Sequence, residues 1–106
     1  MSIHAVTRKA GPAWEDAKGA VDQPGAADHA AFMNQLADEG FVLFAGPLSG
    51  SEYGRIRVLL VVDSPDEATI HRRLADDPWA IAGKLVMARV EPWTLFVGAS
   101  RVVNAA

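Results

Sequence analysis

The chain has 106 residues and a mass of 11.3 kDa, which predicts a single domain with one modest hydrophobic core. Half of the residues are apolar and 22% are charged, so disorder of the whole chain is excluded. The net charge of −3 argues against non-specific nucleic-acid binding, which needs a dense Lys and Arg surface. Without cysteine, the chain can form no disulfide framework, thiolate nucleophile or zinc–thiolate site.

Two features of the sequence lead us to expect a cytoplasmic protein with no membrane partner. The N-terminus lacks the charged start and apolar run of a signal peptide. The longest apolar runs, such as residues 58–62, are far too short to span a bilayer.

The first half of the chain predicts a strand, a long loop and a helix. Residues 3–7 form a short β-prone run. Residues 10–25 are punctuated by Gly and Pro, which predicts a loop that is either a lid over a binding site or a plain connection. Residues 26–39 form a helix that ends at Gly40, and four side chains share its apolar face: His29, Phe32, Met33 and Leu36.

The second half predicts a hairpin, a second helix and a further strand. Residues 41–45 are continuously apolar, which predicts a strand buried on both faces, and residues 55–63 pair with it. Ser64 is expected to cap a helix that has Pro65 at its first position and stops before Pro78.

A short helical turn is expected at residues 79–82, followed by a strand at residues 84–91. Strict alternation in this strand places Leu85, Met87 and Arg89 on one face. Residues 93–97 either extend it or form a fifth strand, and residues 99–106 are expected to fray, which leaves residues 1–98 as the domain.

The resulting order βαββαβ predicts a ferredoxin-like α+β fold, with two helices on one face of a four-stranded antiparallel sheet. The strands carry apolar side chains on both faces, so the second face of the sheet would be bare in a monomer. We therefore expect a homodimer whose sheets pack face to face.

His29 is the first candidate for chemistry, because it lies in the first turn of its helix, directly after the long loop. A neutral imidazole is a usable general base, although a lone histidine on an apolar helix face is more often structural. Asp77 and its neighbour Asp76 are the second candidates, and spacing alone does not decide between them. The alternative role for either aspartate is to cap the turn that follows.

Other residue types point to chemistry less strongly. The three tryptophans either line a ligand pocket or fill the core, namely Trp14, Trp79 and Trp93. Only Asp28 and His29 supply adjacent metal-ligating side chains, so neither a metal site nor a cofactor site is expected.

An ordered set of motifs resembles the YCII-related (YciI-like) family of the dimeric α/β-barrel superfamily over residues 3–97. The motifs are Gly-Pro-Ala-Trp at 11–14, the helix at 29–40, Phe-Ala-Gly-Pro-Leu at 44–48, Asp-Asp-Pro-Trp at 76–79 with Ala-Gly at 82–83, and Val-Glu-Pro-Trp at 90–93. This resemblance implies a ferredoxin-like protomer, a homodimer, and an active-site pair made of His29 and Asp77. It also implies that Gly46 and Pro47 shape the cleft beside them.

Two functions follow from the pattern and the resemblance together. The first is a cofactor-free enzyme in which His29 and Asp77 transfer a proton in an elimination or isomerisation on a small, for example aromatic, molecule. Trp14 and Trp79 would then supply apolar walls. The second is a non-catalytic dimeric module that binds a small ligand in the same cleft.

Overall fold

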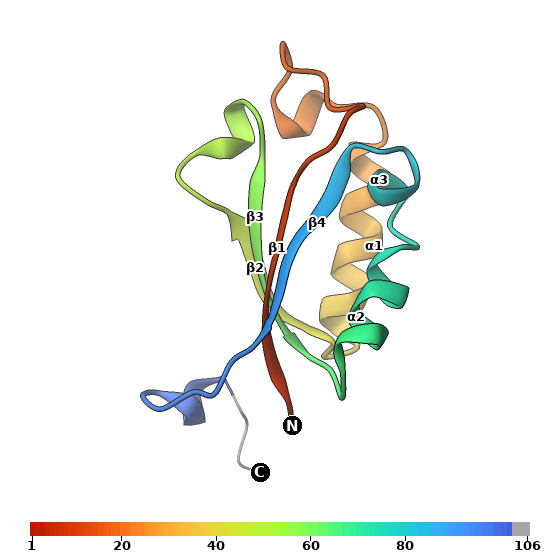
Figure 1. Ribbon diagram of the computed structural model, residues 1–106. Helices are drawn as coiled ribbons and strands as arrows, with labels where there is room; N and C mark the ends of the chain where they lie inside the picture. Colours follow the sequence, from red (N-terminus) through yellow and green to blue (C-terminus); the bar gives the residue numbers. More distant parts are fainter. Residues whose placement is uncertain (103–106) are drawn as a thin grey trace.

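The computed structural model describes residues 1–102 and contains one four-stranded sheet and three helices (Figure 1). Their bounds are β1 (Ile3–Ala10), α1 (Ala26–Asp38), β2 (Val42–Pro47), β3 (Arg57–Asp63), α2 (Glu67–Leu74), α3 (Pro78–Ile81) and β4 (Leu85–Pro92). Single 3-10 turns occur at Ala20–Asp22, Ser51–Tyr53 and Ala99–Arg101. The sheet is antiparallel in the order β2-β3-β1-β4. The predicted ferredoxin-like α+β fold is therefore confirmed.

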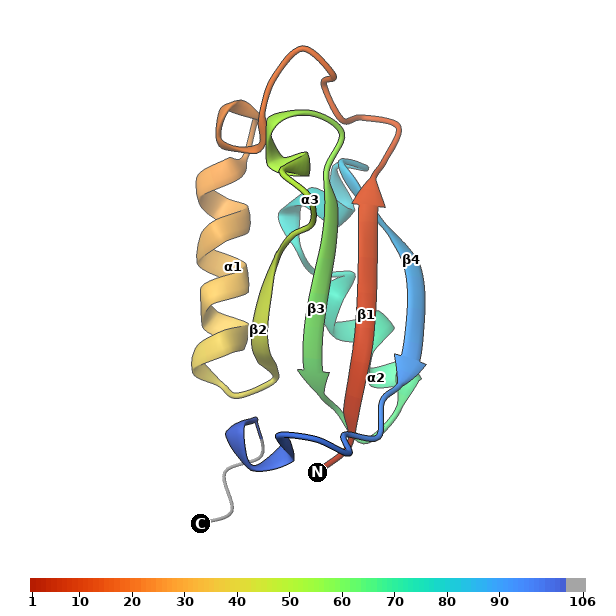
Figure 2. The same cartoon turned by 90° about the vertical axis from the view of Figure 1, so that its left-hand side faces the viewer.

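The helices all lie on one face of the sheet (Figure 1), and Figure 2 shows the opposite face without a helix over it. Between helices and sheet lies the main core, which is Val6, Leu36, Phe41, Val42, Leu60, Val62, Ile70 and Leu74. A second core cluster lies around the start of α3 and contains Ala10, Trp14, Ile56, Trp79 and Leu85. The described part of the chain has no helix long and apolar enough to cross a membrane.

Both edge strands contain one extra residue that shifts their register. In β4 the partners change from Arg8 with Met87 to Thr7 with Arg89, so the intervening residue has no partner in β1. In β2 the residue between Val42 and Phe44 is skipped in the same way. Each is a β-bulge, which reverses the alternation of side chains beyond it.

The predicted alternation of residues 84–91 is consequently wrong beyond the bulge. Leu85 and Met87 share one face as expected, the face toward the helices, but the inserted residue turns Arg89 outward and brings Val90 against the core. The prediction that residues 41–45 are buried on both faces is also wrong for this chain. Phe44 is 55% exposed on the face without helices, where it pairs with Val61.

Element ends differ from the predictions where hydrogen bonds decide them. The first strand continues to Ala10, because its pairing with β4 extends from His4 to Ala10. Helix α2 begins after Asp66, whose Oδ1 accepts a hydrogen bond from the Thr69 N–H at 2.7 Å, while Ser64 Oγ donates to the Asp66 carbonyl. Pro65 therefore precedes the cap instead of opening the helix.

Residues 93–97 do not form a fifth strand. One backbone hydrogen bond continues past the strand, from the Trp93 N–H to the Ile3 carbonyl at 2.9 Å. The prediction that residues 99–106 fray includes residues 103–106, which lie outside the described residues, whereas residues 99–101 form a 3-10 turn.

Candidate active site

Asp77 lies between α2 and α3, where the local sequence fixes its backbone. Pro78 prevents the preceding residue from continuing a helix and itself suits the first position of the next one. Asp77 thus becomes the N-cap of α3, and its Oδ1 accepts a hydrogen bond from the Trp79 N–H at 2.9 Å. The residue has no solvent exposure. The carboxylate is therefore held rigidly inside the protein.

His29 approaches this carboxylate from the first turn of α1, which begins after Gly25 in the left-handed conformation. Its Nδ1 lies 2.9 Å from each carboxylate oxygen of Asp77. Its ring stacks on the indole of Trp79, with 4.0 Å between ring centroids and 9° between planes. The two residues that the sequence singled out are thus in direct contact, although 48 positions separate them.

Arg8 is the third member of the cluster, and the sequence analysis did not identify it. Its Nη1 donates to Asp77 Oδ2 at 2.8 Å, and only 2% of its side chain is exposed. Its Nη2 lies 3.4 Å from the sulfur of Met33 on α1. The pattern of β1 nevertheless indicates that Arg8 points toward the core, because residues two apart in a strand share a face and Val6 is a core residue.

The cluster keeps Asp77 charged in spite of its burial. Burial by itself raises the pKa of a carboxyl group. Hydrogen bonds from His29 and from the Trp79 N–H, together with the charge of Arg8, outweigh this effect and lower the pKa of Asp77. For Arg8, burial lowers the pKa, and the neighbouring Asp77 opposes that change. The pair is therefore an ion pair at neutral pH.

The ionised carboxylate determines which nitrogen of His29 carries the proton. A carboxylate can only accept hydrogen bonds, so Nδ1 must be the protonated nitrogen that donates to Asp77. Nε2 has no hydrogen-bond partner within residues 1–102, and it is not one of the solvent-inaccessible side-chain atoms. In the neutral ring, Nε2 carries a lone pair and is free to accept a proton.

His29 lines a cavity of about 310 Å³ between the N-terminal end of α1 and the sheet. Most of its lining is apolar or small, and it includes Ala20, Val21, Ala26, Ala30, Met33, Ala45, Ile56, Val58 and Leu85. Three charged or titratable side chains join them, Arg8, His29 and Glu52. This combination of apolar walls and few polar groups is typical of small-molecule sites.

The other predicted site residues divide into two groups. Gly46, Pro47 and Trp79 line the cavity. Trp14 does not: its ring packs edge-on against Trp79, with centroids 5.5 Å apart, and its Nε1 donates to the Gly54 carbonyl at 2.9 Å. Trp14 is a core residue that packs against Trp79 and is not itself part of the cavity lining. The loop instead contributes residues 20 and 21 to the lining.

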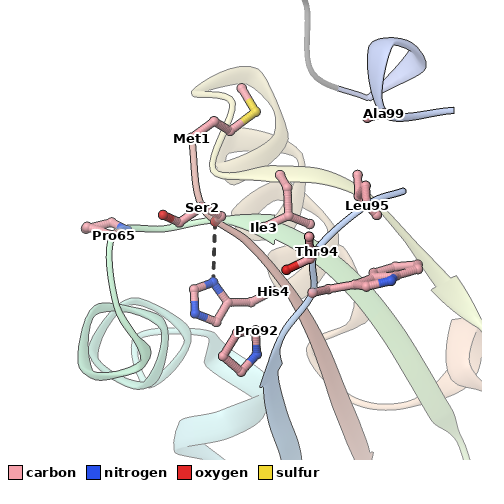
Figure 3. Close-up of a pocket in the computed structure, with 10 residues that line it drawn as sticks. Met1, Ser2, Ile3, His4, Pro65, Pro92, Thr94, Leu95 and Ala99 are labelled. Carbon is pink, nitrogen blue, oxygen red and sulfur yellow. Dashed lines mark hydrogen bonds between the residues drawn. The ribbon is translucent and has the colours of Figure 1, made fainter. Parts of the chain in front are cut away.

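A larger hollow of about 520 Å³ lies at the other end of β1, around His4 (Figure 3). Among residues 1–102 its lining contains no acidic side chain, and the His4 Nδ1 lies 3.3 Å from the Ser2 carbonyl oxygen. In the described part of the chain no carboxylate is hydrogen-bonded to His4 to stabilise its protonated ring, so we place the candidate active site at His29. Residues 1–102 contain no group of three or more His, Asp or Glu positioned to hold a metal ion.

Comparisons with known proteins agree with this fold. The family model of the YCII-related domain matches residues 3–94. The chain is similar in structure to 5-chloro-2-hydroxyhydroquinone dehydrochlorinase from Burkholderia phenoliruptrix AC1100, solved in complex with 2,5-dihydroxybenzoquinone. The TM-score is 0.57 and the identity 17%, over 92% of this chain and 96% of that chain.

At this identity the structural likeness shows the fold alone. A search of curated protein sequences finds no match to the chain. The family model, however, extends over most of the sequence and includes both His29 and Asp77. The chain therefore belongs to the YCII-related domain family.

Proposed function

We propose that this protein is a cofactor-free enzyme in which His29 removes a proton from a small, hydroxylated aromatic substrate. One observation carries the proposal: Asp77 accepts a hydrogen bond from Nδ1 of His29, while Nε2 is left without a protein partner beside the cavity. A base that lines a cavity, is held in one tautomer and keeps its basic nitrogen unpaired is the arrangement that general-base catalysis requires.

In the proposed reaction, Nε2 takes a proton from an O–H or C–H group of the substrate. The electron pair of the broken bond forms a new π bond, and in an elimination the leaving group departs with its own electron pair. The imidazolium that results is stabilised by the ionised Asp77, which is itself held by Arg8. The proton then leaves His29 to water, and the leaving group is released as an anion.

The walls of the cavity support an aromatic substrate. An apolar cavity of about 150 Å³ is large enough for benzene, so about 310 Å³ accommodates one substituted ring. The similar solved structure is a dehydrochlorinase in complex with a dihydroxybenzoquinone, which favours elimination over isomerisation as the reaction type.

The test is release of chloride from 5-chloro-2-hydroxyhydroquinone under argon, together with deuterium exchange into its ring positions followed by NMR. We expect the wild-type protein to accelerate one of the two processes. His29→Gln should lower the rate about 100-fold or more, because a positioned general base contributes at least this factor. His71→Gln is the matched control, since His71 is half exposed on α2, its side chain is hydrogen-bonded to Glu67, and it does not line the cavity.

A wild-type protein that accelerates neither process contradicts the catalytic proposal. If the same protein binds the hydroquinone in an NMR titration, the result favours the alternative function, a non-catalytic ligand-binding module. If His29→Gln and His71→Gln have equal rates, His29 is not the base.

We also propose that the protein is a homodimer in which the two sheets pack with their uncovered faces together. The face without helices carries apolar side chains from three strands that are at least partly exposed, among them Ala5, Phe44 and Leu59. Light scattering at micromolar concentration should give about twice the mass of the chain, and Leu59→Glu should halve that mass. A monodisperse wild-type monomer contradicts this assembly.

A further inference from the structure

Glu52 is a polar residue of the cavity that the proposed reaction does not use. It lies in the 3-10 turn Ser51–Tyr53, between Gly50 and Gly54. Figure 2 shows this turn, coloured green, at the same end of the sheet as the start of α1. Glu52 and His29 therefore line one cavity from two different elements of the fold.

The carboxylate of Glu52 is unusual because it has no hydrogen-bond partner within residues 1–102. Its Oε1 is closed off from solvent and is one of two such side-chain atoms in this part of the chain. Buried carboxylate oxygens in native proteins are nearly always hydrogen-bonded, because the loss of hydration costs free energy. Oε2 is also without a partner within residues 1–102 but is not closed off, so a molecule bound in the cavity can supply the donor that this carboxylate lacks.

The rest of the lining limits what else such a molecule can contact. Arg8 is paired with Asp77 through its Nη1, and its buried Nε is the other side-chain atom of residues 1–102 that has no partner. Apart from Arg8 and Glu52, the side chains of the lining carry no nitrogen or oxygen except in the ring of His29 and in the indole of Trp79, whose Nε1 donates to the Pro24 carbonyl. Among the described residues, His29 Nε2 and Glu52 Oε2 are thus the two side-chain nitrogen or oxygen acceptors of the lining that are neither paired nor closed off.

We propose, resting on the proposed function, that Glu52 determines the specificity of this site. It accepts a hydrogen bond from a second hydroxyl or amino group of the substrate, and it excludes substrates that carry a carboxylate. The χ3 torsion of glutamate has a broad minimum, so either oxygen can turn towards the ligand. A carboxylate on the ligand at that position would meet a like charge between apolar walls.

The test uses three single-ring molecules that differ in one substituent: hydroquinone, phenol and 4-hydroxybenzoate. Their dissociation constants are measured by NMR titration under argon for the wild type and for Glu52→Gln, which keeps the size of the side chain. The wild type should bind hydroquinone about tenfold or more tighter than phenol, since a hydrogen bond to a charged group has that effect. It should bind 4-hydroxybenzoate most weakly.

In Glu52→Gln the preference for hydroquinone over phenol should fall to about fivefold or less, the effect of a neutral hydrogen bond. Binding of 4-hydroxybenzoate should become tighter in the same variant, because the like charge is gone. Glu67→Gln is the matched control: Glu67 is exposed in the first turn of α2, and its substitution should leave all three affinities unchanged.

Equal preferences in wild type and Glu52→Gln would overturn the inference but leave the proposed function standing, because His29→Gln tests that separately. Weakening of all three ligands by the same factor would also overturn it, since a structural role predicts this result. If the wild type binds none of the three at millimolar concentration, both the specificity role and the proposed substrate class are wrong.

Discussion

The buried pair of Arg8 and Asp77 makes a quantitative prediction about stability. The Nη1–Oδ2 distance is 2.8 Å, and the two side chains are 2% and 0% exposed. Removing one partner of such a pair leaves an uncompensated charge in the interior, which costs about 3–5 kcal/mol. Asp77→Asn should therefore lower the free energy of unfolding by about that amount, because Arg8 keeps its charge.

Arg8→Met should cost less than Asp77→Asn. Asp77 retains hydrogen bonds from His29 and from the Trp79 N–H, which partly compensate the carboxylate charge that is left without Arg8. In the double variant neither charge remains, so the combined loss should be about 1–3 kcal/mol smaller than the sum of the single losses.

Urea denaturation at pH 7 measures these differences. With an m value of about 1–3 kcal/mol/M, Asp77→Asn should lower the midpoint by at least about 1 M. His71→Gln serves as a control on the helix side of the molecule, where the histidine is half exposed. Additive losses in the double variant would refute the reasoning, since they would mean that Arg8 and Asp77 are not energetically coupled.

Three further predictions concern pH and packing. Because the folded-state pKa of Asp77 is lowered, its stabilisation is complete above the ordinary value of about 3.9 and is lost below it. When the pH is lowered below about 4, the urea concentration at the unfolding midpoint should decrease for the wild type, and it should decrease less for Asp77→Asn. Trp79→Phe removes the hydrogen bond to Pro24 and part of a buried ring, which should cost about 1–3 kcal/mol in the same assay. Gly11→Ala places a Cβ 2.3 Å from the Gly83 carbonyl oxygen and should lower the thermal midpoint, whereas Gly46→Ala meets open space and should not.

The sequence determined much of the site because local signals marked its two central residues. Helical periodicity predicted that His29 lies on the inward face of its helix. The proline after Asp77 predicted that one helix ends there and that an aspartate caps the turn that follows. Spacing did not decide between Asp76 and Asp77, nor did it bring His29 near either of them. That contact depends on the packing of α1 beside α3, and only the family resemblance pointed to it before the structure.

Arg8 and Glu52 were missed for different physical reasons. Arginine is rarely buried without a partner, so the sequence pattern predicts an exposed side chain for Arg8 near the end of its strand. Its partner is 69 positions away. Glu52 lies in a polar turn, where a glutamate is ordinary, and only the three-dimensional lining of the cavity distinguishes it.

The bulges were equally invisible in the sequence. A bulge is a property of two paired strands, and the alternation of one strand does not reveal an unpaired position. Strict alternation therefore correctly placed Leu85 and Met87 on a common face, but it wrongly placed Arg89 on that face as well.

The position of the bulges has a consequence for how this protein avoids aggregation. In the order β2-β3-β1-β4 the two outermost strands are the two that carry an inserted residue, and each ends in a proline, Pro47 or Pro92. Exposed strand edges readily template pairing with other chains, and bulges and prolines interrupt the regular ladder that such pairing needs. Growth of the sheet into longer ribbons by pairing with other chains is therefore disfavoured at both of its edges.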